Sequence, residues 1–404
     1  MKQRNLVSPW LTLLIVGALL TVGMATTHKI AQNPHGPSLV VSEADQQVEK
    51  EFLLNARQLT FEGKRSGEGY FSADGSKLIF QAERSPENPF FQIYLMDLGT
   101  GEVHRVSPGH GKTTCAWVHP SGQKVLFAST HEDPDARSKQ EEELLRRAEG
   151  RELRYSWDYD EHYDIFESDL KGDNLKKLTW ALGYDAEASW SPDGRHIVFS
   201  SNRHGYTEKL TAEDAKLFEM DKSSLVELYL MNADGSDVQR LTHSEGYDGG
   251  AFFSPDGEEI CWRRFSKDGA VAEIYRLSLT DLHEKQITHL GAMSWAPFYH
   301  PSGDYFIFST NLQGFANFEL YLVDIEGKRE PIRVTYTEGF DGLPVFSPDG
   351  TQLLWTSNRT SGKQSQLFLA DWNDMKARQR LGIGPGITRQ VSPENQPAIP
   401  DITS

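Results

Sequence analysis

The sequence predicts an all-β fold, a six-bladed β-propeller made of four-stranded blades. Two independent markers predict it, and each occurs six times along the chain. The first is a tight turn of the Ser-Pro-Asp-Gly type, and the second is a strand that ends in an apolar residue followed by a hydroxyl residue. Repeats of about 40–50 residues with several short strands each are typical of propeller blades.

The tight turn is clearest at Ser191-Pro192-Asp193-Gly194, which separates two apolar runs. Proline sets φ for the first central position, aspartate bonds its own backbone, and glycine accepts a positive φ. Successive turn glycines are separated by 47, 72, 63, 46 and 47 residues, so two blades carry inserts. The six glycines are Gly75, Gly122, Gly194, Gly257, Gly303 and Gly350.

The apolar-hydroxyl pair recurs in step with the turn and marks the end of each fourth strand. Third strands such as 228–232 alternate like half-buried strands and lead into a second, Gly-containing turn. The first turn therefore joins strands one and two, and the second joins strands three and four. The six pairs are Leu59-Thr60, Val106-Ser107, Leu178-Thr179, Leu241-Thr242, Ile287-Thr288 and Val334-Thr335.

Ring closure is also predicted by these markers. The last blade supplies strands near 343–346, 353–357 and 366–370, but no apolar-hydroxyl strand follows Trp372. The unassigned copy is Ala56–Thr60, at the other end of the repeat region. We expect this N-terminal strand, about 56–60, to complete the last blade, because it would pair an otherwise open sheet edge.

The segments outside the repeats suggest export. Residues 1–25 combine Lys2 and Arg4 with an apolar run of 17 residues, 9–25, that ends in small residues. A signal peptide is favoured over an inner-membrane anchor, because spans need about 17–25 residues. We therefore expect a periplasmic or otherwise exported protein. The expected boundaries are a polar tether at 26–55, the propeller at 56–375 and a disordered Pro/Gly-rich tail at 376–404.

Composition limits the partners. A net charge of −17 and a pI near 5.2 argue against nucleic acid and favour a cationic partner or simple solubility. The two cysteines, Cys115 and Cys261, fall on different blades. They are too far apart for a disulfide, and we expect buried free thiols.

Both inserts are expected on one face of the ring. Blade two has an insert at about 131–163 with a helix-forming stretch at 138–149, and blade three has a helix start at Thr211. Both lie between strands two and three. That loop opens on the same face as the loops that link successive blades, and we call this the insert-bearing face.

Three of the inter-blade loops carry an aspartate after an aromatic residue, each with a glycine 11 residues before the turn glycine. This spacing predicts three carboxylates at the mouth of the central channel. They could each cap their own loop by bonding backbone N–H groups. Alternatively, they could form a collar that binds Ca²⁺ or a basic peptide. The candidate residues are Tyr184, Asp185, Tyr247, Asp248, Phe340 and Asp341.

A second candidate is the acidic and aromatic stretch where the insert of blade two returns to the ring. Aromatic side chains beside charges are typical of binding faces, although they could instead pack the insert onto the ring. His131 and His204 share this face, but loop histidines are more often solvated or structural. The candidate residues are Trp157, Asp158, Tyr159, Asp160 and His162.

The repeats resemble those of the TolB family of periplasmic propellers. The resemblance rests on the Ser-Pro-Asp-Gly turns, the strand ends 201–203 and 357–359, and the Met-Asn-Ala-Asp-Gly run at 231–235, and it covers about 56–372. It implies a propeller whose channel binds extended partner segments. TolB has a small α/β domain before its propeller, and residues 28–55 are too short for one, so we expect a TolB-like protein rather than TolB.

The resemblance leaves other functions open, because similar repeats occur in peptidase propellers and propeller lyases. The sequence has no Gly-x-Ser-x-Gly elbow, His-Glu-x-x-His motif or phosphate-binding loop, and no catalytic residue is assigned. We therefore favour a protein or peptide binder. The alternatives are a metal-dependent polysaccharide lyase or hydrolase, and a non-catalytic accessory to a separate peptidase.

Overall fold

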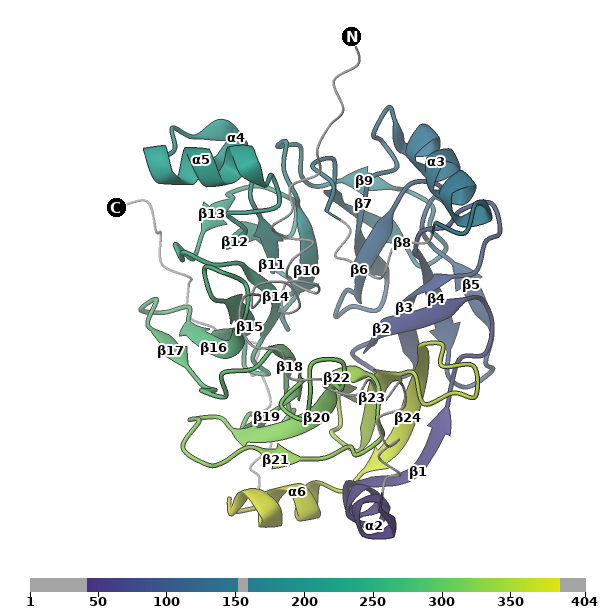
Figure 1. The fold of residues 1–404 in the computed structure, drawn as a ribbon, viewed down its shortest axis with the longest axis vertical. Helices are drawn as coiled ribbons and strands as arrows, with labels where there is room; N and C mark the ends of the chain where they lie inside the picture. The colour runs from purple at the N-terminus through teal and green to yellow at the C-terminus, as the bar shows by residue number, and fades with distance from the viewer. Residues whose placement is uncertain (1–41, 152–158, 386–404) are drawn as a thin grey trace, which may run out of the picture.

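The computed structural model describes residues 42–151 and 159–385, which form a ring of six antiparallel four-stranded sheets (Figure 1). This confirms the predicted fold. Blades one to three are β2 (Arg65–Phe71), β3 (Lys77–Glu83), β4 (Gln92–Asp97) and β5 (Val103–Arg105); β6 (Thr113–Val118), β7 (Lys124–Ser129), β8 (Asp164–Asp169) and β9 (Lys176–Lys177); and β10 (Ala186–Trp190), β11 (His196–Ser201), β12 (Glu227–Asn232) and β13 (Gln239–Arg240).

Blades four to six continue the same order, with the first strand of each blade nearest the ring centre (Figure 1). They are β14 (Asp248–Phe253), β15 (Glu259–Phe265), β16 (Ala272–Ser278) and β17 (Glu284–Gln286); β18 (Ser294–Tyr299), β19 (Tyr305–Thr310), β20 (Glu319–Asp324) and β21 (Ile332–Arg333); and β22 (Asp341–Phe346), β23 (Gln352–Ser357) and β24 (Gln366–Trp372), completed by β1 (Leu53–Gln58).

The N-terminal strand closes the ring, as predicted. β1 pairs antiparallel with β24, so that Leu53 lies opposite Trp372 and Gln58 opposite Phe368. The strand begins and ends slightly earlier than the expected 56–60. The two ends of the repeat region therefore hold each other, because β1 covers the edge of β24 that would otherwise be open.

Two helices differ from the sequence expectation. α2 (Glu43–Phe52) occupies part of the expected polar tether, and α6 (Asp374–Leu381) occupies the start of the expected tail. Both begin with a side-chain cap, and Phe52 is buried with its ring 6.0 Å from that of Trp372. α6 also buries Ala377 and Leu381, and its Arg378 bonds Asp304 of blade five at 2.9 Å. Figure 1 shows the two helices side by side, α2 next to β1 of blade six and α6 next to β21 of blade five; the rest of the tail, 386–404, lies outside the described residues.

The hydroxyl marker clamps the outer two strands of each blade together. In blade three, Thr242 Oγ1 accepts the Leu228 N–H at 2.9 Å and donates to Glu227 at 2.6 Å. The same arrangement recurs around the ring. The hydroxyl's acceptors at the start of the third strands are Gln92, Asp164, Glu227, Glu273, Glu319 and Gln366.

Every inner strand contains a β-bulge at the same place. The residue at each bulge has a φ between 47° and 64°, in the left-handed region. Only one of these residues is glycine, although side chains disfavour this conformation. The repeated geometry is therefore imposed by the blade. The six bulge residues are Glu68, Cys115, Glu187, Gly250, Ala296 and Leu343.

Aromatic rings fill the ring axis two residues after the bulges. Tyr70 of blade one lies 5.5 Å from Phe252 of blade four, and Trp117 of blade two lies 6.4 Å from Phe298 of blade five. These are opposite blades, so their rings meet across the axis. At this level the central channel is closed. The inner strands start at the insert-bearing face. The aromatic layer lies further along these strands, towards the opposite face.

The inserts lie where the sequence predicted them. α3 (Ala136–Ala148) belongs to the connection from β7 to β8, and α4 (His204–Thr207) and α5 (Ala212–Met220) belong to the connection from β11 to β12. Cys115 and Cys261 are free and buried, as expected. No helix in the ranges 42–151 and 159–385 has the length and apolar character needed to cross a membrane.

Candidate functional site

The three predicted aspartates lie at the starts of inner strands, and each forms an ion pair within its own blade. The partner is an arginine at or just after the end of the second strand. All three carboxylates are buried, with exposures of 0%, 0% and 1%. The pairs are Asp185–Arg203, Asp248–Arg264 and Asp341–Arg359, with N–O distances of 2.6, 2.7 and 2.7 Å.

Neither interpretation of the sequence included these ion pairs. The carboxylates accept hydrogen bonds from second-strand side chains, Ser201 for Asp185 and Trp355 for Asp341, and each is already neutralised by a guanidinium. Burial raises the pKa of Asp185 to about 6 despite its arginine. Within the described residues, no group of three or more His, Cys, Asp or Glu is arranged to hold a metal ion. Ca²⁺ binding by the three aspartates stays a prediction.

Two of these aspartates also meet a second buried acid from the preceding blade. Burial, with the nearby Asp248 carboxylate next, raises the pKa of Glu227 to about 7. Burial also raises the pKa of Glu319 to about 7, and Asp341 adds to the effect. Both glutamates also accept the hydroxyl that joins the outer two strands of their blade. The charge at each of these hydroxyl clamps therefore depends on an aspartate of the next blade, across the seam between the two blades.

The aromatic residues before the aspartates have three different environments. Tyr184 is buried, with Tyr159 and Tyr163 rings 5.9 and 5.5 Å away. Phe340 lies 5.8 Å from Phe318 in a partly exposed cluster over blades five and six. Tyr247 reaches the ring centre, as described below. The structure thus does not bring the three together as one collar.

The acidic and aromatic stretch fastens the insert of blade two to the ring. Trp157 and Asp158 lie outside the described residues. The Tyr159 hydroxyl accepts from Asn202, just after β11, at 3.1 Å and lies 2.8 Å from the Tyr206 hydroxyl of α4. The buried Asp160 is paired with Lys112, just before β6, at 3.5 Å and with Lys139 of α3 at 2.8 Å. These contacts favour the packing interpretation.

The nearby histidines are dispersed within the described part of the chain. His162 Nε2 lies 3.9 Å from Asp133, and His204 Nδ1 lies 3.0 Å from the Tyr229 hydroxyl. His131 contacts Ser129 at 3.0 Å, and burial lowers the pKa of its ring to about 4. Each histidine has a local structural partner, as the structural interpretation of loop histidines suggested.

The ring centre holds a polar cluster that the sequence reading missed. Glu187 lies at the bulge of blade three and reaches towards blade four. Its carboxylate accepts from Arg263 Nη2 at 2.7 Å, the Tyr247 hydroxyl at 2.9 Å, the Gly250 N–H at 2.8 Å and the Ser200 hydroxyl at 2.9 Å. Glu187 is thus one of the most extensively bonded carboxylates of the ring.

Glu68 and Cys115 complete this cluster from blades one and two. The Tyr70 hydroxyl donates to Glu68 at 3.2 Å. Burial raises the pKa of the Glu68 carboxyl, and that of the Cys115 thiol well above its ordinary value. A sequence signal existed, because all six bulge residues lie seven positions before their turn glycine.

Exposed apolar side chains gather on the insert-bearing face. In the described ranges, seven of the eleven exposed large apolar residues lie on its loops or inserts, while four lie elsewhere, on β1, on α6 and on turns of the opposite face. Exposed aromatic side chains among the seven are candidate anchors for a partner. The seven are Phe61, Leu145, Trp180, Leu182, Met220, Leu312 and Phe315, and the four are Leu54, Leu175, Val238 and Met375.

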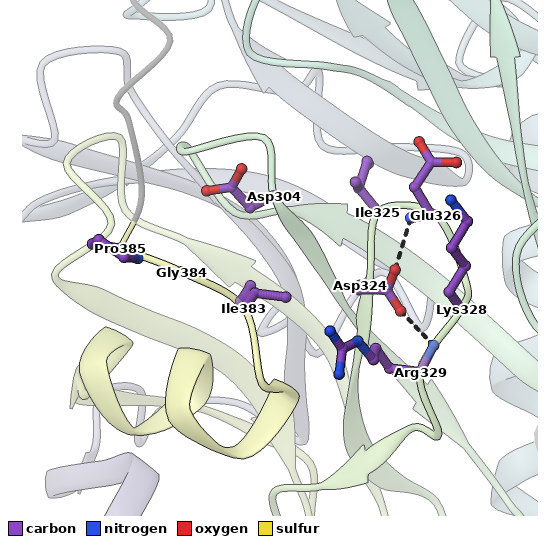
Figure 2. A pocket seen from close by; sticks show the side chains of 9 residues that line it. All are labelled: Asp304, Asp324, Ile325, Glu326, Lys328, Arg329, Ile383, Gly384 and Pro385. Atoms are coloured by element: carbon purple, nitrogen blue, oxygen red, sulfur yellow. Dashed lines mark hydrogen bonds between the residues drawn. The ribbon is translucent and has the colours of Figure 1, made fainter.

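A small hollow of about 330 Å³ lies elsewhere, on the opposite face of blade five (Figure 2). It is formed by two turns of that blade and the segment after α6. Asp324 stabilises one turn by accepting the backbone N–H of Arg329 at 2.7 Å. Its lining is part of the turn structure, and it does not adjoin the ring centre.

Comparisons with known proteins agree with this architecture. No family model matches the chain. The Tol-Pal system protein TolB of Francisella tularensis is 28% identical over 219 residues, which are 53% of this chain and 44% of that protein. Dipeptidyl-peptidase 5 of Porphyromonas gingivalis is 27% identical over 30% of this chain and 17% of its own. The chain thus spans less than half the length of these relatives.

A solved structure of a protein provisionally named TolB, from Agrobacterium tumefaciens, has a TM-score of 0.52 and 18% identity. The match covers 78% of this chain and 94% of that one. At this identity the likeness establishes the fold alone, and the sequence match to TolB adds the relationship. Together with the six repeated turns and the ring closed by β1, they make this chain a TolB-like β-propeller.

Proposed function

We propose that this chain is an exported propeller that binds a protein or peptide partner on its insert-bearing face. The observation that carries the proposal is the concentration of exposed apolar side chains there. Phe61 is 72% exposed and Trp180 is 67% exposed, and both follow the hydroxyl of a fourth strand. Large aromatic side chains are the usual anchors of protein interfaces.

The class of partner follows from the molecule's charge and from its relatives. The net charge of −17 favours a partner with a basic surface. The relatives named as Tol-Pal system proteins suggest a protein assembly, although the match covers under half of their length. Export is supported by the basic start and apolar run of residues 1–25.

A face-specific double variant tests the proposal. Phe61→Ser/Trp180→Ser removes two anchors from the insert-bearing face, and Leu175→Ser/Val238→Ser is the matched control on the opposite face. Proteins captured from an envelope extract by the wild-type chain would be identified, purified and titrated against all three chains. We expect the first variant to weaken Kd at least tenfold and the control to change it less than twofold. Equal binding by both variants would contradict the proposal.

A further inference from the structure

The ring centre has one polar half. The bulge residues of blades one to three are Glu68, Cys115 and Glu187, whereas the equivalent residues of blades four to six carry no polar side chain. A left-handed conformation disfavours side chains, and glycine would adopt it freely. Two carboxylates and a thiol thus occupy positions where the backbone would favour glycine.

The two carboxylates differ in how they are satisfied. Glu187 has four donors, including the guanidinium of Arg263, which neutralises it. Glu68 is partly buried and accepts from the Tyr70 hydroxyl and the Cys115 thiol. It forms no ion pair with a described residue of 42–151 or 159–385, although the charge of Arg263 lowers its pKa. Two carboxyl groups thus share one guanidinium at the centre.

The surroundings of Glu68 suit a cation. Burial and the nearby Glu187 raise the pKa of Glu68, whereas the Cys115 thiol, the Tyr70 hydroxyl and Arg263 lower it. A cation that bound here would stabilise the ionised carboxylate further. Two residues further along the inner strands lies the aromatic layer, where the Tyr70 and Trp117 rings are 4.7 Å apart. A carboxylate beside aromatic rings is a combination that recognises ammonium and guanidinium groups.

The one guanidinium of this cluster is already engaged. Arg263 is only 6% exposed, and its Nη2 donates to Glu187 at 2.7 Å and to the Tyr247 hydroxyl at 2.9 Å. The guanidinium lies against the bulge of blade four, since a Cβ added to Gly250 would stand 2.2 Å from Nη1. Arg263 is therefore held on Glu187, and Glu68 is the carboxyl of the cluster that remains without an ion pair among the described residues.

We propose that the ring centre binds the cationic group of a lysine or arginine, with the Glu68 carboxylate as its anchor. The inference rests on the proposed function, because it names the chemistry of the partner segment that enters the ring. The approach is from the insert-bearing face, since aromatic rings close the other side. Cys115, at 9% exposure, lies beside Glu68 and provides a reporter.

The test measures the rate at which Cys115 reacts with small methanethiosulfonates of different charge. Trimethylammonium-ethyl, sulfonatoethyl and neutral methyl reagents would be compared on the full chain. The ratio of cationic to anionic rates cancels the thiolate fraction, which is the same for all three. The fully buried Cys261 is the internal control, and Cys115→Ser confirms the site of labelling.

We expect the cationic reagent to react at least tenfold faster than the anionic one, after correction for their rates with a free thiol. Glu68→Gln should lower this ratio at least threefold. Glu62→Gln is the matched control, because Glu62 is an exposed acid of the loop before β2 and should leave the ratio unchanged. Circular dichroism verifies that each variant is folded.

Ligand protection supplies the second readout. N-acetyl-lysine amide should slow neutral labelling of Cys115 at millimolar concentration, whereas N-acetyl-norleucine amide should not. Equal ratios in wild type and Glu68→Gln would overturn the proposal, as would a Cys115 that reacts only in urea. Protection by Ca²⁺ without protection by the lysine amide would also overturn it and assign the centre to a metal. None of these results depends on partner capture, so the two proposals can fail separately.

Discussion

Blades one to three and blades four to six share one backbone and differ at one equivalent position. Each inner strand has the same left-handed bulge, occupied by Glu68, Cys115 and Glu187 in the first half. In the second half the position holds glycine, alanine and leucine. The comparison separates two kinds of information. The repeated backbone features specify the fold. The side chains that differ at the bulge position place polar groups at the ring centre.

The largest expected effect comes from breaking the polar half. Glu187→Leu should reduce the free energy of unfolding by about 3–5 kcal/mol, because it removes the carboxylate that forms an ion pair with the buried Arg263 at 2.7 Å. Leu343→Ala, at the same position of blade six, is partly exposed and should lose less than half as much. Urea unfolding followed by tryptophan fluorescence measures both.

A double variant separates charge from volume in this prediction. Glu187→Leu/Arg263→Met removes both charges and should recover more than half of the lost stability. If the double variant is less stable than Glu187→Leu, the loss comes from packing and the charge argument is wrong.

A smaller effect is expected where the bulge residue is glycine. Gly250→Ala should destabilise by about 2 kcal/mol, because the new Cβ would stand 2.2 Å from Arg263 Nη1. Ala296 shows that the backbone itself tolerates alanine at this position, with a φ of 50°. Ala296→Gly is therefore the control, and it should change the stability by less than about 1 kcal/mol. Equal losses in both variants would assign the effect to the backbone instead of the arginine.

The fold was predictable because its signals recur and are local. The Ser-Pro-Asp-Gly turn and the hydroxyl that ends each fourth strand make contacts within their own blade, such as Thr242 with Glu227. Each copy therefore carries its own evidence, and six copies give the blade number and the closing strand. The helices α2 and α6 were missed because their polar sequences are ordered by tertiary contacts, Phe52 of α2 with Trp372 and Arg378 of α6 with Asp304.

The candidate site was less predictable because it depends on residues far apart in the sequence. The positions of Asp185, Asp248 and Asp341 followed from spacing, but their arginine partners lie 16 to 18 residues later in the same blade. Glu68 and Glu187 lie on blades one and three, with blade two between them, and come near each other only in the closed ring. Aligning the bulges would have singled them out, but only the structure shows that the aligned positions face one centre.

The seams between blades give the last expected effect, a dependence of stability on pH. Glu227 and Glu319 have an ordinary pKa of 4.5 in the unfolded chain and about 7 in the folded ring, through burial and a neighbouring aspartate. The folded state therefore binds more protons than the unfolded state between these values. Their contribution to stability is fully present below about 4.5 and is lost as the pH rises through about 7.

Blades one and six offer the matched variant for this prediction. The same clamp position holds Gln92 and Gln366, which accept the hydroxyl at 2.7 Å without a charge. Glu227→Gln/Glu319→Gln should therefore fold and should flatten the loss of stability between pH 5 and pH 8 by up to about 5 kcal/mol. Urea unfolding at the two pH values measures the difference against wild type, which cancels the titration of all other groups. An unchanged pH slope in the double variant would mean that Arg240 and Arg333 hold both glutamates ionised throughout, so that the clamps are electrostatically equivalent in all six blades.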